Sequence, residues 1–166
     1  MKYLVTGITG AGKTSVSNEL RKLGFTAYDG DKRTGLGRWV DGNDKPVRVP
    51  ARLTRDWIER HHWNWDESHI KRLLSQHQTV FICGSSSNVD KFYSCFDKVY
   101  LLSVSQQTMK NRLNARSYGF GKFKQEQQLA LAWHEWFEKH HRNLGATIID
   151  ANQPLKSVID DLLKQL

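Results

Sequence analysis

The chain has 166 residues, of which 39% are hydrophobic, and this length suits one domain, spanning residues 1–166, with a single core. No apolar run approaches the roughly 20 residues that a membrane-spanning helix needs, so we expect no membrane partner. The net charge of +8 suits an anionic ligand and also raises nucleic acid as a partner, but we favour an ordinary basic, solvated surface over nucleic-acid binding because no long block of like charges occurs.

Short runs with β character alternate with helical segments along the chain. Strands are expected at Tyr3–Thr6, Phe25–Asp29, Thr79–Cys83, Lys98–Leu102 and Ala146–Asp150. Helices are expected at Thr14–Leu23, Ala51–His61, Trp65–Gln76, Ser105–Arg116, Gln125–Asn143 and Pro154–Gln165. Strands that are apolar on both faces and separated by helices predict an α/β fold, a three-layer sandwich with a five-stranded parallel sheet between helices.

The helix expected at Gln125–Asn143 carries large apolar residues at helical spacing. The stripe consists of Leu129, Trp133, Trp136, Phe137 and His140. We expect this stripe to face the core and not to bind a cofactor.

A glycine-rich motif lies between the first strand and the first helix. It reads Gly7-Ile8-Thr9-Gly10-Ala11-Gly12-Lys13-Thr14, a complete G-x-x-x-x-G-K-[ST] pattern. Backbone N–H groups of such a loop, together with the helix N-terminus, form a nest for phosphate. We expect Lys13 to reach the β- and γ-phosphates of ATP and the Thr14 hydroxyl to ligate Mg²⁺. The residues predicted to bind the nucleotide here are Gly7, Gly10, Ala11, Gly12, Lys13, Thr14 and Ser15.

Two further pairs of charged residues stand where a phosphate site could use them. Asp29 and Asp31 stand at the end of the second strand, and carboxylates two apart on an extended segment point to the same side. An Asx-type turn is the alternative, because Asp-Gly favours turns. Arg112 and Arg116 are four apart on one helix face, which either serves the site or is simply solvated.

Residues 32–76 are rich in arginine and tryptophan, and the resemblance given below implies that they form an acceptor-binding insertion. Arg48, Arg52 and Arg55 lie there with four of the six tryptophans. Arg52 and Arg55 are three apart in the helix expected at 51–61, so they could form one clamp. Arginine beside aromatic surface suits a flat anionic acceptor or a nucleic-acid end; alternatively, the tryptophans pack and the arginines are solvated. The adjacent histidines 61 and 62 point in different directions, so we expect no metal there.

With these elements placed, the chain resembles the small P-loop kinases, which include nucleoside monophosphate, shikimate and gluconate kinases. The resemblance rests on the glycine-rich motif, on Asp29-Gly30-Asp31, on Arg112-x-x-x-Arg116 and on the loop after the fifth strand. It implies a P-loop NTPase fold and an ATP- and Mg²⁺-dependent enzyme that moves the γ-phosphoryl group to a small anionic or hydroxylated acceptor.

The resemblance also implies roles for single residues. Asp29 would stand on the metal side, and Asp31 would contact the acceptor hydroxyl as a base. Arg112 would lie over the adenine, and Arg116 would touch the transferring phosphoryl group. Residues 117–124, with two glycines, would form a closing lid. Two more positions are carried over: Ala151 to Gln153 beside the adenine, and Gly84 beside the acceptor.

One departure from the usual pattern keeps alternatives open. The third strand ends Cys83-Gly84-Ser85, without a Walker B aspartate, so metal ligation falls to Thr14, water and the aspartate pair. A non-kinase ATP-dependent switch therefore stays possible, as does a nucleic-acid 5′-end kinase, and the oligomeric state is open.

The expected compartment is the cytoplasm. The first residues lead directly into the glycine-rich motif, so we expect no signal or transit peptide. The two cysteines, Cys83 and Cys95, are expected to be buried thiols in a reducing environment.

Overall fold

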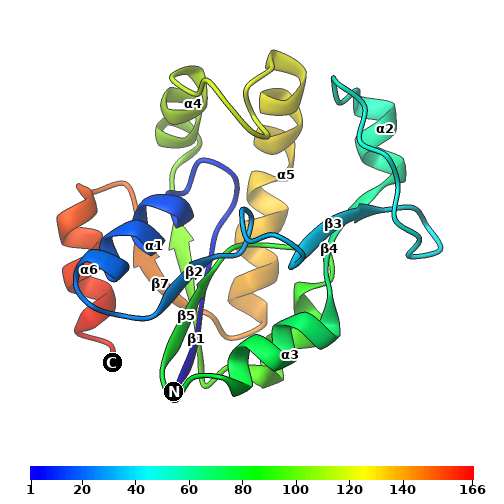
Figure 1. Ribbon diagram of the computed structural model, residues 1–166. Coiled ribbons are helices and arrows are strands. Elements are labelled where there is room, and N and C mark those ends of the chain that lie inside the picture. Colours follow the sequence, from blue (N-terminus) through cyan, green and yellow to red (C-terminus); the bar gives the residue numbers. More distant parts are fainter.

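The computed structural model describes all 166 residues. Its centre is a five-stranded sheet in the order β2-β5-β1-β6-β7, with every neighbouring pair parallel. The strands are β1 (Lys2–Thr6), β2 (Ala27–Asp29), β5 (Val80–Cys83), β6 (Lys98–Ser103) and β7 (Thr147–Asp150). The predicted parallel sheet is thereby confirmed (Figure 1).

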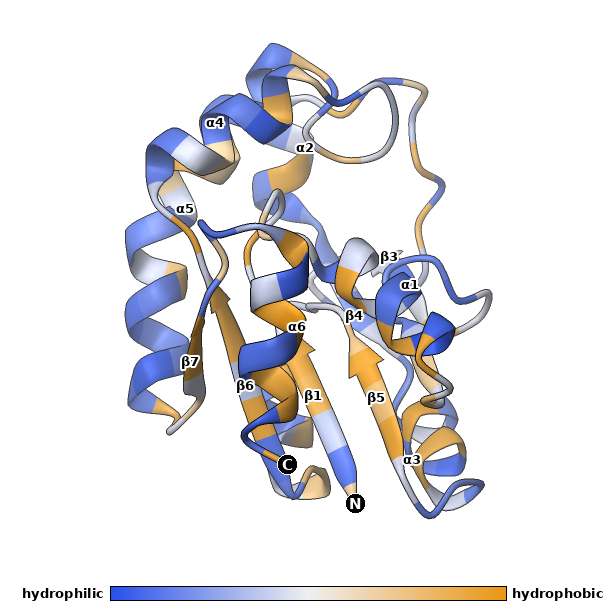
Figure 2. Cartoon of the chain, turned by 90° about the vertical axis from the view of Figure 1, so that its left-hand side faces the viewer, coloured by the Kyte–Doolittle hydropathy of each residue, from blue (hydrophilic) through white to orange (hydrophobic).

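Helices cover both faces of the sheet because its central strands are apolar on both sides. One core of 20 buried residues lies under α1 (Lys13–Lys22) and α6 (Leu155–Leu163), which stand in front of the sheet in Figure 2. A second core of 14 buried residues lies on the opposite face, under α3 (Glu67–Ser75) and the 3₁₀ segment η1 (Val89–Cys95). The three-layer sandwich is therefore built from two hydrophobic cores.

Two more helices lie near the carboxyl ends of the strands, and the longer of them runs back alongside the sheet (Figure 1). They are α4 (Gln106–Asn114) and α5 (Lys124–Asn143), and the segment 115–123 joins them. Ser105 begins α4, and its hydroxyl oxygen accepts a hydrogen bond from the Thr108 N–H, 3.1 Å away, as the sequence predicts for a serine N-cap.

An arm formed by residues 37–65 projects from the sheet (Figure 1). It consists of β3 (Gly37–Val40), α2 (Arg55–Arg60) and β4 (His62–Trp65), and the two strands pair antiparallel. The helix expected from residue 51 begins only at Arg55, where the Thr54 hydroxyl caps it. The helix expected from Trp65 begins at Glu67, because Asp66 is the N-cap and accepts from the His69 N–H.

The arm has a small aromatic core of its own. Trp39 contacts both Trp57 and Trp63, with ring centroids 4.9 and 6.0 Å apart. Packing is thus the main role of these three tryptophans, as the simpler of the two sequence interpretations states. Trp65 is different, because it is 2% exposed and belongs to the second core of the sheet.

The expected core stripe on α5 is only partly correct. Leu129 is buried and Phe137 packs against both cores. However, Trp133 is 39% exposed and Trp136 is 64% exposed. Helical spacing placed these residues on one side of α5, but that side extends beyond the edge of the core.

Cys83 is buried, Cys95 is half-buried, and both are free thiols. None of the helices has both the length and the apolar character required to cross a bilayer.

Candidate active site

The glycine-rich loop joins β1 to the first turn of α1. Gly12 immediately precedes α1 and has φ of 105°, a value that side chains other than glycine rarely adopt. The N-terminus of α1 carries no side-chain cap, so its first N–H groups are available to a phosphate. The local geometry is that of an anion-binding loop.

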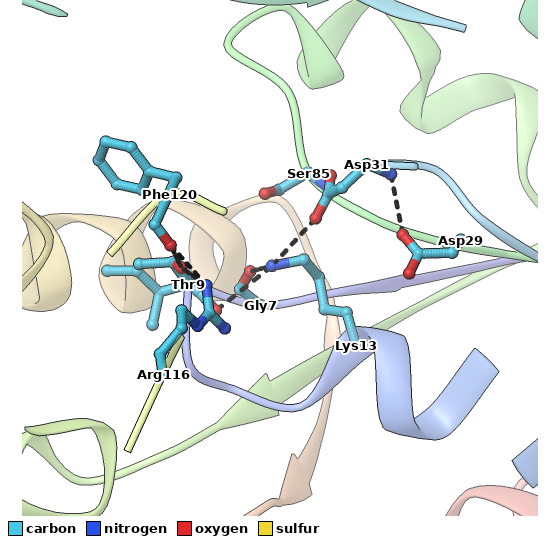
Figure 3. A network of polar contacts seen from close by, with 9 residues as sticks. Gly7, Thr9, Lys13, Asp29, Asp31, Ser85, Arg116 and Phe120 are labelled. Carbon is cyan, nitrogen blue, oxygen red and sulfur yellow. Dashed lines mark hydrogen bonds and ion pairs between the residues drawn. The ribbon is translucent and has the colours of Figure 1, made fainter. Parts of the chain in front are cut away.

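Lys13 is buried, with 7% of its side chain exposed, and oxygen atoms surround its ammonium group (Figure 3). Nζ donates to the Gly7 carbonyl oxygen at 2.7 Å and lies 3.7 Å from Asp31 Oδ2. A buried ammonium requires such partners. The loop lysine and the predicted acceptor-side carboxylate therefore meet at one point.

The extended segment ends at Asp29, which lies opposite Cys83 in the pairing of β2 with β5. The Asp31 N–H donates to Asp29 Oδ1 at 3.1 Å, so the Asx-type turn forms as well. Asp31 Oδ1 in turn accepts from the Ser85 N–H at 3.2 Å (Figure 3). The turn, rather than strand alternation, aims Asp31 at Lys13.

Burial raises the pKa of Asp31 above the ordinary value of 3.8, although Lys13 and the Ser85 N–H act in the opposite direction. The carboxylate is therefore a stronger base than a free aspartate. About a third of the side chain stays accessible, with 37% exposed, so a ligand can still reach it.

The fit to a divalent cation can be judged from the oxygen atoms present. Asp29 Oδ2 is buried without a hydrogen-bond partner, and Thr14 lies in the first turn of α1. No group of three or more His, Cys, Asp or Glu side chains is arranged to hold a metal. One carboxylate and one hydroxyl fit Mg²⁺, which prefers oxygen ligands and keeps several of its waters.

The two arginines of α4 and its C-terminal end both contact the glycine-rich loop. Arg112 Nη2 donates to the Ala151 carbonyl oxygen at 2.8 Å, and Nη1 donates to that of Ala11 at 3.2 Å. Arg116 Nη1 donates to Thr9 Oγ1 at 3.0 Å and to the Phe120 carbonyl oxygen at 2.5 Å (Figure 3). Both side chains are half-buried at the loop, so the solvated-face interpretation does not describe them.

The segment expected to be a lid is attached on both sides. Besides Arg116, the buried Glu126 holds it, with Oε2 accepting from the N–H groups of Gly121 and Phe123. On its other side, the Lys32 ammonium lies 5.0 Å from the Tyr118 ring centroid. Residues 117–124 therefore connect the glycine-rich loop with the segment that follows β2.

The arginines of the arm do not form the expected helical clamp. Arg48, Arg52 and Arg55 are all exposed. Arg52 precedes α2 and lies over the Phe123 ring, while Arg55 pairs with Glu59 at 2.7 Å. The structure thus brings Arg52 to Phe123, in the segment expected to be a lid, and leaves the other two on the outside of the arm.

The remaining predicted positions lie near the loop. Ala151 is buried at the end of β7 beneath Arg112, and the side chain of Gln153 donates to Asp161. Ser15 is exposed in the first turn of α1. Gly84 is buried at the end of β5, and an added Cβ there would lie 2.7 Å from Trp65 Cζ2 and 3.1 Å from the Gly30 Cα.

Sequence reasoning did not identify three residues that contribute to the site. Thr9 contacts Arg116, the Ser85 N–H contacts Asp31, and Trp65 packs beneath Gly30 and Gly84. Glycines directly after two neighbouring strands were a signal of close packing, but the packing partner, Trp65, comes from the β3–β4 ribbon within the predicted insertion, and that ribbon was not predicted.

A family model described as an AAA domain matches residues 4–134. The chain belongs to this family. A search of curated proteins found no match to the chain. The AAA-domain match includes the glycine-rich loop, both aspartates and both arginines of the site.

Solved structures share the fold of this AAA-family chain at low sequence identity. A shikimate kinase from Acinetobacter baumannii in complex with shikimate matches with a TM-score of 0.60 and 18% identity, covering 99% of this chain and 89% of that one. A gluconokinase from Sinorhizobium meliloti gives 0.59 and 19%, covering 98% and 89%. A deoxyadenosine kinase from M. mycoides with bound dATP gives 0.57 and 15%, covering 99% and 98%. The resemblance to small P-loop kinases, predicted from the motifs, is confirmed for the fold.

Proposed function

We propose that this protein transfers the γ-phosphoryl group of ATP to a hydroxyl or phosphate group of a small acceptor. The observation that carries the proposal is the 3.7 Å approach of Lys13 Nζ to Asp31 Oδ2. A phosphate-binding lysine and an accessible carboxylate of raised pKa would stand on the two sides of the bond to be made. Simple nucleotide binding does not require the second group.

The nucleotide would lie along the loop, with its phosphates against the backbone N–H groups at the start of α1. Lys13 would exchange its bond to the Gly7 carbonyl for a phosphate oxygen. Arg112, held between the loop and Ala151, would offer its planar guanidinium to the adenine.

Mg²⁺, held by the Thr14 hydroxyl and by Asp29 through water, would neutralise charge on the phosphate oxygens. Asp29 could assume this role because its register opposite Cys83 places a carboxylate one strand away from the usual Walker B position. The absence of that aspartate from β5 is therefore no obstacle to metal binding.

Asp31 would orient the acceptor hydroxyl and accept its proton. Its raised pKa favours this role, because a base works best when its pKa approaches the working pH. Arg116 would stabilise the charge on the transferred group, since phosphoryl transfer is catalysed mainly by positioning and electrostatics.

The related folds support a hydroxylated acceptor. The neighbours are named as kinases of shikimate, of gluconate and of deoxyadenosine, which all present hydroxyl groups. The deoxyadenosine kinase was solved with dATP bound, which supports a nucleotide as the other ligand.

The direct test is whether an acceptor stimulates ADP formation by the purified protein. We expect stimulation by at least one small hydroxylated compound, and its loss in Asp31→Asn. ATP hydrolysis that ignores every acceptor would favour a switch instead. Phosphorylation restricted to oligonucleotide 5′ ends, with binding that weakens steeply in salt, would favour a nucleic-acid kinase.

A further inference from the structure

Helix α5 has two flanks with different surroundings. On one flank, His134 Nε2 lies 2.6 Å from the Val104 carbonyl oxygen, and Glu138 Oε2 accepts from the Ser103 hydroxyl at 2.8 Å. Ser103 ends β6, and Val104 follows it. This flank therefore faces the β6 side of the sheet.

The opposite flank carries Trp133, Trp136 and His140, which are spaced by three and four residues and so share one side of the helix. Because β5 and β2 lie on the other side of β1 from β6, this flank is turned toward β5, which Gly84 follows, and toward β2, which ends at Asp29. The 2.9 Å contact of His140 Nε2 with Asp90 of η1, the segment after β5, agrees with that direction.

The lid contacts this flank of α5, and the arm stands next to the lid. The Trp133 ring stacks parallel to Phe120 of the lid, with centroids 6.2 Å apart and an interplanar angle of 7°. Arg52 of the arm lies over Phe123, and α5 runs between α4 and the arm in Figure 1.

The loop before η1 fixes the arm opposite α5. The Asn88 side chain accepts from the Trp65 N–H at 2.9 Å and donates to the Trp65 carbonyl oxygen at 3.0 Å. The same Trp65 packs against Gly30 and Gly84 beside Asp31. Trp65 thus joins the arm to the neighbourhood of Asp31, while the aromatic flank contacts the lid through Phe120 and η1 through Asp90. The flank therefore lies on the side of α5 where these three parts of the molecule stand.

Two tryptophans are exposed on this flank, at 39% for Trp133 and 64% for Trp136. The Trp136 ring stacks on His140 with centroids 4.9 Å apart and an interplanar angle of 12°, and this stacking holds the indole in place. Exposed indoles that are held in place cost hydration free energy and present flat π surfaces.

We infer that the aromatic flank, formed by Phe120, Trp133, Trp136 and His140, stacks on the nucleobase of the acceptor. The inference rests on the proposed phosphoryl transfer and names its acceptor class as a nucleoside or nucleotide. A polyhydroxylated acid has no π face for an indole and requires fixed hydrogen-bond donors or cations. Among the flank residues only His140 is ionisable, and it already pairs with Asp90.

Binding is measured first, by calorimetry with the full-length protein and a non-hydrolysable ATP analogue in the P-loop. The probes are the four common deoxynucleosides, their 5′-monophosphates, shikimate and gluconate. We expect at least one base-bearing probe to bind, and Trp136→Ala and Trp133→Ala each to weaken it at least about fivefold, as loss of one stacking contact does. Trp136→Phe should keep most of the affinity, and Lys139→Ala, an exposed change elsewhere on α5, should change nothing.

Tight binding of gluconate or shikimate alone, or base binding that ignores both tryptophan substitutions, would overturn the inference. Circular dichroism and ATP-analogue affinity of each variant separate unfolding from loss of stacking.

Transfer of label from ATP to the same probes separates this inference from the proposed function. Labelled nucleoside or nucleotide, with a raised KM and nearly unchanged kcat in Trp136→Ala, supports both. If label appears on gluconate or shikimate alone, the proposed transfer is supported and the nucleobase inference is contradicted. If nucleobase binding depends on the tryptophans but no label is transferred, the stacking surface is supported and the proposed phosphoryl transfer is contradicted. A short oligonucleotide, included as a further probe, distinguishes a free nucleoside acceptor from a strand end that carries the same base.

Discussion

Asp31 is a carboxylate on which two opposing effects act. Removal of water raises its pKa, and the neighbouring Lys13 charge lowers it, with burial the larger effect. At the residue scale the site therefore depends on how Asp31 is held, and two backbone contacts, to Asp29 and from Ser85, hold it.

The pH dependence of turnover should report this carboxylate. A general base must be ionised, so kcat/KM should fall as the pH drops through the raised pKa of Asp31, at a pH clearly above its ordinary value of 3.8. The raised pKa also means that the folded state favours the protonated form. The contribution of Asp31 to stability is thus complete at low pH and is lost as the pH rises through that pKa. We expect Asp31→Asn to lower the rate by about 10²-fold or more and to remove the acid limb of the pH profile. An acid limb at or below pH 3.8 in the native protein, or one that persists in Asp31→Asn, would contradict the assignment.

Arg116 should matter for the rate more than for nucleotide affinity. Its guanidinium spans Thr9 and the Phe120 carbonyl at the loop mouth, where the transferring group would pass. We expect Arg116→Ala to lower kcat by about 10³-fold or more, as for other phosphoryl-transfer arginines, with a much smaller change in the affinity for ATP. Arg112→Ala is the matched comparison, and there the KM for ATP should rise instead. Equal effects of both changes on kcat would contradict the separate roles given to Arg116 in the transfer step and to Arg112 in nucleotide binding.

At the scale of elements, the sequence was sufficient wherever a local pattern decides the structure. The glycine-rich loop, the five parallel strands and α4 follow from motif and periodicity, and they position Lys13, Arg112 and Arg116. The β3–β4 ribbon was missed because Trp39 and Trp63 are paired by tertiary contact across 23 intervening residues, which no local pattern reveals. The exposed positions of Trp133 and Trp136 were missed for a related reason: periodicity identifies one side of α5, but not where the core ends.

Gly84 tests how tightly the arm is joined to the sheet. A Cβ at this position would come within 2.7 Å of Trp65 Cζ2 and 3.3 Å of Asp31 Oδ1. We expect Gly84→Ala to lower the free energy of unfolding by about 1–3 kcal/mol through overpacking, and to reduce acceptor turnover as well by displacing Asp31. Gly42→Ala is the control, since nothing lies within 4 Å of an added Cβ there. Denaturant unfolding of the two variants measures the difference, and equal stabilities would show that Trp65 yields freely.

At the scale of the whole molecule, the site is assembled from distant parts of the chain. Five segments meet around Lys13 and Arg112: the glycine-rich loop, the segment after β2, the end of β5, α4 and the end of β7. A ligand that binds all of these at once should stabilise the fold cooperatively.

ATP with Mg²⁺ should therefore raise the melting temperature. At about 100 times Kd the gain is roughly 2.7 kcal/mol, or about 5–10 °C for a chain of this size. Lys13→Ala should lose most of the shift, because the phosphates lose their cation while the remaining core is unchanged. A full shift in Lys13→Ala, read by calorimetry, would show that the nucleotide binds elsewhere.

The measurement that tests the central claim most directly is transfer of labelled γ-phosphate from ATP across a panel of acceptors, with Lys13→Ala beside the native chain. The panel holds nucleosides, nucleoside monophosphates, shikimate, sugar acids and 5′-hydroxyl oligonucleotides. The structure predicts a labelled small-molecule product that disappears in Lys13→Ala and falls steeply in Asp31→Asn. Label found only as free phosphate, or a product that survives the loss of Lys13, would contradict it.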